Sequence, residues 1–197
     1  MKERPGGNAF ELVTAMSMTI GRGRLARAVI DAVGLVPDDR VLDIGCGPGT
    51  AVREAARRAA AATGVDPSPL MLRLARWISR LRRTGSVSWL EGRAEELPVP
   101  DALATVAWAL SSAHHWSDRA AGLGEAWRAL APAGRLVIAE RLVKAGARGH
   151  ATHGLSSDQA EELARQAAAA GFTDVRIRRA RAGRRELVIV GGLKNLR

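Results

Sequence analysis

The sequence is poor in cysteine, tyrosine, phenylalanine and lysine, and it has no long hydrophobic run. With one cysteine, Cys46, it can form neither an internal disulfide bond nor a metal site built from cysteines. The longest uncharged stretch, residues 102–115, is too short to cross a bilayer as a helix. Residues 1–16 contain no apolar segment of the kind that signal peptides have. We therefore expect a soluble, cytoplasmic protein without a membrane span.

Basic residues exceed acidic ones by 30 to 20, which gives a net charge of +10. Such an excess is typical of proteins that bind nucleic acid. Nearly all of the basic residues are arginine, however, and alanine is abundant, a usage that looks like the coding bias of GC-rich DNA. The two basic clusters, residues 73–83 and 173–197, are interpreted as solvated faces, because the second contains no aromatic residue that could stack on bases. Nucleic-acid binding stays the less favoured alternative.

Strand and helix patterns alternate along the chain after a helical lead-in expected over residues 9–18 and 25–33. Short apolar runs predict strands at 40–45, 64–66, 87–90, 103–110 and 134–140, and helices are expected at 50–62, 68–83, 117–130 and 156–170. Thr50 and Ser68 are the expected N-caps of the first two of these helices, and Ser156 or Ser157 that of the last. Two strands joined by a turn at 181–183 end the chain. This order predicts a doubly wound α/β domain with a mostly parallel sheet, helices on both faces and one antiparallel strand.

A glycine-rich loop, GCGPGT over residues 45–50, follows the first predicted strand. Its three glycines let the backbone turn sharply and approach a ligand closely. The spacing differs from the NAD fingerprint, because Thr50 stands where the last glycine of that fingerprint would be. Asp43 ends the first strand, and Asp66 ends the second at the distance from the loop where an acid meets a ribose diol. Since ligands of open α/β sheets bind at the carboxyl ends of the strands, we expect a nucleoside-containing cofactor there.

Five segments carry a family resemblance: VLDIGCGPGT at 41–50, GVDPSPLMLRLAR at 64–76, EGRAEELPVPD at 91–101, LAPAGRLVIAE at 130–140, and the predicted last helix with its following strand at 153–177. Together they resemble the class I S-adenosylmethionine-dependent methyltransferases, in particular the methyltransferase type 11 group. The resemblance covers nearly the whole chain. It implies a Rossmann-like sheet of seven strands in the order 3-2-1-4-5-7-6 with the last strand antiparallel. It also implies S-adenosylmethionine as the cofactor and S-adenosylhomocysteine as the product.

The resemblance also implies the residues that bind the cofactor. Gly45, Cys46 and Gly47 would wrap its methionine end, with Asp43 near the amino group, and Asp66 would hold the ribose hydroxyls. The other expected contacts, with the adenine or at the end of the fourth strand, are Pro67, Met71, Arg93, Ala94 and Ser111. Cys46 is expected to be a small packing residue without reactivity.

Two positions depart from the family pattern. Arg93 stands where an acid is common, with Glu95 as the candidate substitute, and the fourth strand begins with Ala104 and Thr105 instead of an aspartate. A catalytically degenerate domain that binds the cofactor without turnover is therefore one alternative.

The candidate catalytic residues are His114 and His115, in the segment that follows the fourth strand. Either could act as general base for an acceptor that must lose a proton, and the alternative is that one caps the turn while the other packs. His150 and His153 lie before the last helix. Four histidines suggest a metal ion only if they converge, and we predict no metal.

We expect a single domain with four parts: a helical lead-in and candidate lid at 1–35, a cofactor-binding core at 36–140, a short gate at 141–155, and the last helix with a basic hairpin at 156–197. The predicted function is methyl transfer from S-adenosylmethionine to a small-molecule acceptor by in-line displacement, which positioning of the reactants promotes. An RNA methyltransferase that uses the basic face is the second alternative. The acceptor and the oligomeric state do not follow from the sequence.

Overall fold

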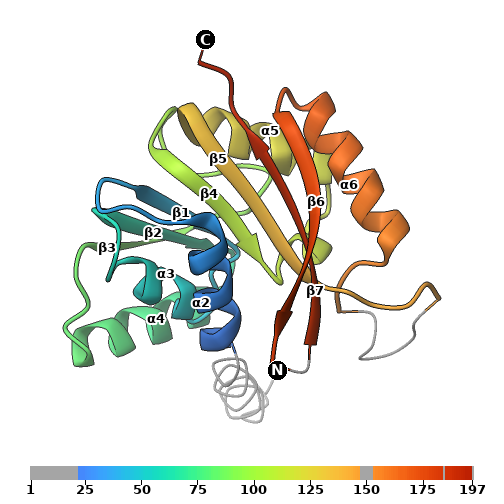
Figure 1. The fold of residues 1–197 in the computed structure, drawn as a ribbon. Coiled ribbons are helices and arrows are strands. Elements are labelled where there is room, and N and C mark those ends of the chain that lie inside the picture. Colours follow the sequence, from blue (N-terminus) through green and yellow to red (C-terminus); the bar gives the residue numbers. More distant parts are fainter. Residues whose placement is uncertain (1–21, 147–152, 184, 197) are drawn as a thin grey trace, which may run out of the picture.

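The computed structural model describes residues 22–146, 153–183 and 185–196, and its centre is a seven-stranded sheet (Figure 1). The strands are β1 (Arg40–Ile44), β2 (Ala61–Asp66), β3 (Val87–Glu91), β4 (Ala104–Leu110), β5 (Leu130–Arg141), β6 (Thr173–Ala182) and β7 (Arg185–Leu193). Their order in the sheet is β3-β2-β1-β4-β5-β7-β6, and β7 runs antiparallel to both of its neighbours. The predicted fold class and strand order are confirmed.

Helices cover both faces of this sheet (Figure 1). They are α2 (Arg22–Val33), α3 (Thr50–Ala55) and α4 (Pro69–Leu81) on one face, and α5 (Arg119–Ala129) and α6 (Ser157–Ala169) on the other. A short 3₁₀ helix, η1 (Ala113–His115), follows β4. Each face has its own cluster of buried apolar side chains, so the sheet separates two hydrophobic cores.

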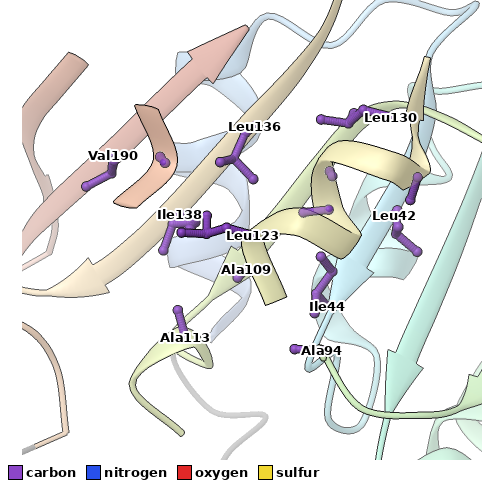
Figure 2. Close-up of a cluster of buried hydrophobic side chains, with 14 of the residues drawn as sticks. Leu42, Ile44, Ala94, Ala109, Ala113, Leu123, Leu130, Leu136, Ile138 and Val190 are labelled. Carbon is purple, nitrogen blue, oxygen red and sulfur yellow. The ribbon is translucent and has the colours of Figure 1, made fainter. Parts of the chain in front are cut away.

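The central strand β4 shows why the sheet is buried on both sides. Val106 and Trp108 face the core beneath α2 and α3, whereas Ala107 and Ala109 face the core beneath α5 and α6. Side chains alternate between the two faces of a strand, so a strand covered on both faces consists of apolar residues throughout. Figure 2 shows Ala109 of β4 and Leu123 of α5 in the same cluster of buried apolar side chains.

Two helix starts agree with the prediction. The Ser68 hydroxyl accepts a hydrogen bond from the Met71 backbone at the start of α4. Of the two candidates for α6, Ser156 is the N-cap, and it forms a capping box with Gln159.

The helix predicted over residues 50–62 is too long. It ends at Ala55, and the alanines from residue 61 onward begin β2, which pairs with β1 and β3. Alanine favours helices, but this preference is weak and sheet pairing overrides it here. Thr50 is not the N-cap either, because Gly49 occupies that position in a left-handed conformation.

Part of the predicted domain organisation falls outside the described residues, namely the candidate lid within residues 1–21 and positions 147–152 of the predicted gate. The described part of the gate includes a parallel bridge between Leu142 and Leu155. In the part of the chain that the structure describes, no helix is long and apolar enough to pass through a bilayer.

Candidate functional site

The ends of β1, β2 and β4 are tied together by hydrogen bonds at the carboxyl edge of the sheet. The backbone amides of Gly45 and Cys46 donate to the Val65 carbonyl at 2.8 and 3.0 Å. The Ser112 hydroxyl donates to the Ile44 carbonyl at 2.6 Å. These bonds fix the glycine loop relative to the segments that follow β2 and β4, at the edge where ligands of such sheets bind.

Gly45 and Gly49 have positions that no other residue could take without strain. Their φ angles are +78° and +75°, in the left-handed region. A Cβ on Gly45 would lie 2.5 Å from the Cβ of Ser112, and one on Gly49 would lie 2.1 Å from the Trp89 ring. The loop therefore needs glycine for packing against its own sheet as well as for access by a ligand.

Asp66 lies at the end of β2, and it is 8% exposed. Its Oδ2 accepts a hydrogen bond from the Gly47 amide at 2.7 Å, and its Oδ1 accepts one from the Ser68 amide at 2.9 Å. A carboxylate offers about four acceptor positions, so these two bonds leave capacity for further donors. Asp66 thus joins two loops and can still bind a pair of hydroxyl groups.

A cavity of about 420 Å³ opens at this edge of the sheet, within the roughly 300–1,000 Å³ that is usual for small-molecule sites. Eight of the ten residues predicted for cofactor binding line it: Gly45, Gly47, Asp66, Pro67, Met71, Arg93, Ala94 and Ser111. The other lining residues are Gly92, Glu95, Ser112, His115, Trp116 and Ser117. The structure thus brings together residues from four loops, and their binding of a cofactor stays a prediction.

The two remaining residues of that set, Asp43 and Cys46, are buried beside this cavity, where they line a smaller one together with Gly45. Burial raises the pKa of the Cys46 thiol well above its ordinary value, and the negative charges of Asp43 and Asp66 raise it further. A thiol in this state stays protonated and unreactive. The geometry is consistent with the packing role expected for Cys46.

The histidines after β4 lie next to an acid from β5. The Nδ1 of His114 is 2.9 Å from Oε2 of Glu140, and the His114 backbone amide donates to Oε1 at 3.3 Å. His153, from the segment before α6, has its ring centroid 5.6 Å from that of His114 and 5.8 Å from that of His115. Three histidines therefore converge, whereas His150 lies outside the described residues. Glu140 was not among the predicted site residues, although an acid at the end of the apolar run LVIAE was a signal.

Comparison with known proteins agrees with this geometry. Residues 42–138 match the family model described as a methyltransferase domain. The demethylmenaquinone methyltransferase of Tropheryma whipplei is 36% identical over 114 residues, which are 58% of this chain and 46% of that protein. An O-methyltransferase of Aspergillus nomiae is 33% identical over 132 residues, 66% of this chain and 59% of that one. The domain over residues 42–138 belongs to the class I S-adenosylmethionine-dependent methyltransferases.

The solved structures show the same fold. A methyltransferase from Aquifex aeolicus superposes with a TM-score of 0.77 at 18% identity, over 92% of this chain and 97% of that one. This likeness concerns the fold. The family matched by the sequence, whose members use S-adenosylmethionine, is as predicted. The chain spans about half the length of the curated relatives that it matches.

The departures of this methyltransferase domain from the family pattern have different consequences. Thr105 donates to Asp39 at 2.6 Å near the amino end of β4, so the position of the missing aspartate lies outside the cavity. Arg93 is exposed and lines the cavity. Glu95 also lines it, and its Oε1 accepts hydrogen bonds from the Ser117 amide and hydroxyl at 2.7 and 2.8 Å. Burial raises the pKa of Glu95, but its hydrogen bonds outweigh this and lower it, so Glu95 is an ionised link to the start of α5.

Proposed function

We propose that this chain transfers the methyl group of S-adenosylmethionine to a small-molecule acceptor. The observation that carries the proposal is the cavity at the ends of β1, β2 and β4, with the buried carboxylate of Asp66 in its wall. The names of the curated relatives support an acceptor of this class, since one acts on demethylmenaquinone and another is an O-methyltransferase.

The residues of the cavity fit the cofactor in size and chemistry. The two free acceptor positions of Asp66 suit a ribose diol, and the backbone at Gly45 and Gly47 leaves room for the methionine end. Pro67 and Met71 offer apolar surface to the adenine. When bound, the cofactor supplies an electrophilic methyl group on sulfur. The task of the chain is to align the acceptor with that methyl group and to exclude water, which can lower the barrier by roughly 7–11 kcal/mol at best.

The acceptor end of the cavity is formed by the segment after β4. Ser111, which is not glycine, has a φ of +54° there, and such strain concentrates at functional sites. His115 is exposed and lies in the cavity wall, so it is placed to contact an acceptor. Trp116 is seated on α5, because a Cβ on Gly122 would lie 2.7 Å from its ring, and it serves mainly to hold η1 against the helix.

Calorimetric titration with S-adenosylmethionine and S-adenosylhomocysteine tests the cofactor site in the wild type and in two variants. Asp66→Asn keeps the shape of the side chain but removes its charge. Hydrogen bonds to charged groups contribute about 1.5–3 kcal/mol each, so losing one should weaken binding by roughly 10- to 100-fold. Glu91→Gln is the matched control, because Glu91 pairs with Asp66 in the sheet register but is exposed outside the cavity. The proposal fails if the wild type does not bind, or if both variants bind equally well.

Turnover is measured as transfer of a labelled methyl group to a panel of quinols, phenols and total tRNA. Transfer to members of the small-molecule set supports the proposal. Transfer to tRNA alone would instead favour the RNA methyltransferase, in which the exposed arginines of α4 and β6 would contact the phosphates. Cofactor binding without transfer to any acceptor would favour the degenerate domain.

A further inference from the structure

We propose that His114, His115 and His153 form a binding site for a divalent transition-metal ion, zinc in the first place, next to the methyl-transfer cavity. One ring nitrogen from each residue can be chosen so that all three lie within 4.8 Å of one another. The residues come from two distant segments, η1 after β4 and the segment before α6. The tertiary structure alone brings them together.

The least exposed member of the cluster, His114, is oriented as a metal ligand would be. Its side chain is 10% exposed, and Glu140, which is 1% exposed, holds its Nδ1 at 2.9 Å. A carboxylate only accepts hydrogen bonds, so Nδ1 carries the proton and Nε2 presents its lone pair. A histidine that binds a metal commonly donates its other N–H to a carboxylate in this way.

The Nε2 atom of His114 is buried, and it has no hydrogen-bond partner among the described residues. Five other buried side-chain atoms of the described residues also lack a partner, but this one belongs to a residue of the histidine cluster. Buried polar atoms in proteins nearly always have a partner, so Nε2 is available to a ligand of that cluster. The missing hydrogen-bond partner of this atom is a separate observation from the convergence of the three histidine rings.

The donor set selects the type of ion. Imidazole nitrogens suit zinc, copper, nickel and iron, whereas magnesium and calcium prefer oxygen. Zinc–nitrogen bonds of about 2.0–2.1 Å place tetrahedral ligand atoms about 3.4 Å apart, so nitrogen atoms that lie within 4.8 Å of one another must approach by as much as about 1.4 Å. His115 and His153, the exposed members of the cluster, would make this approach, while Glu140 fixes the ring of His114.

Three protein ligands with an open fourth position are typical of catalytic zinc sites. His115 also lines the methyl-transfer cavity, so the open position would face the acceptor. This second step rests on the proposed function. An ion there would bind the hydroxyl oxygen of the acceptor and ease the loss of its proton to solvent, in place of a general base. That oxygen then forms the O–CH₃ bond as the S–CH₃ bond breaks, and S-adenosylhomocysteine leaves.

Titration of metal-free protein, produced without a histidine tag, with Co²⁺ tests the site through visible absorption. We expect one equivalent to bind with the strong bands of tetrahedral Co²⁺, and Zn²⁺ to displace it. His114→Ala and His153→Ala should each weaken binding at least tenfold. Glu140→Gln, which preserves the shape of the side chain, should weaken it by roughly 10- to 100-fold because the ring of His114 loses its carboxylate partner.

Two measurements keep this test separate from that of the cofactor site. Asp66→Asn should bind Co²⁺ like the wild type although it binds S-adenosylmethionine weakly. His153→Ala should bind S-adenosylmethionine like the wild type, because His153 lies outside the cofactor cavity, and this shows that it is folded. The metal site is refuted if Co²⁺ does not bind saturably, or if His153→Ala binds it as well as the wild type, even where His114→Ala fails to fold.

Discussion

Replacement of Gly45 by alanine tests how closely the ends of β1 and β4 approach each other. An alanine at φ +78° costs about 1–2 kcal/mol, since its Cβ crowds the following carbonyl. The added Cβ would also lie 2.5 Å from the Cβ of Ser112, and overpacking of this kind typically costs about 1–3 kcal/mol. Gly45→Ala should therefore lower the free energy of unfolding by about 2–5 kcal/mol, measured by urea denaturation.

Gly34→Ala is the matched control for the cost of placing an alanine at a positive φ angle. Gly34 has a φ of +64°, but nothing lies within 4 Å of the position of its Cβ. Both variants also reduce the entropy of the unfolded chain in the same way, so the difference between them isolates the overlap with Ser112. If Gly45→Ala destabilises the protein no more than Gly34→Ala does, the reasoning is wrong.

A double-mutant cycle tests whether the Ser112 side chain is responsible for the overlap. Ser112→Gly removes the Cβ that an alanine at 45 would meet, together with the hydrogen bond to the Ile44 carbonyl. Gly45→Ala combined with Ser112→Gly should cost about 1–3 kcal/mol less than the sum of the two single variants, because the overlap is relieved. Strict additivity would contradict the proposed contact.

Three further predictions concern the stability and reactivity of the fold. Arg128 donates to the Glu125 carboxylate and to the carbonyls of Leu97 and Val99, so Arg128→Ala should lower the free energy of unfolding by about 1–3 kcal/mol, and a loss in urea denaturation below about 0.5 kcal/mol would contradict this. Burial raises the pKa of Asp39, but hydrogen bonds and the charge of Arg135 outweigh this and lower it. The stability that Asp39 contributes is therefore present above its unfolded-state pKa of about 3.9 and is lost as the pH falls through its lower folded-state pKa. Asp39→Asn should flatten the dependence of the free energy of unfolding on pH between about pH 5 and pH 2, measured by denaturation. An unchanged slope would count against the hydrogen bonds and the ion pair of Asp39 with Arg135. Cys46 should react with a thiol-specific dye only after denaturation, because it is 5% exposed and its pKa is raised, and rapid labelling of the native protein would be the contrary result.

Features that depend on a few neighbouring residues could be predicted from the sequence. The glycine loop and Asp66 could be placed at one edge of the sheet because a strand end, a sharp turn and a carboxylate at a set spacing are typical of a nucleoside-binding site. The N-cap at Ser68 could also be predicted, because its hydroxyl bonds to a backbone amide only three residues later in the chain. The start of β2 could not be placed, since the alanines there have helix propensity and only pairing with β1 and β3 makes them a strand.

The sequence by itself determined the doubly wound sheet, its two apolar faces and the position of the candidate cofactor cavity, because hydrophobic periodicity and turn chemistry act over a few neighbouring residues. Only the tertiary structure decided that His114 meets Glu140 and His153. Those contacts depend on the register of β4 against β5 and on the path of the chain into α6. Such distances between remote segments are set by the packing of the whole domain, which no local pattern encodes.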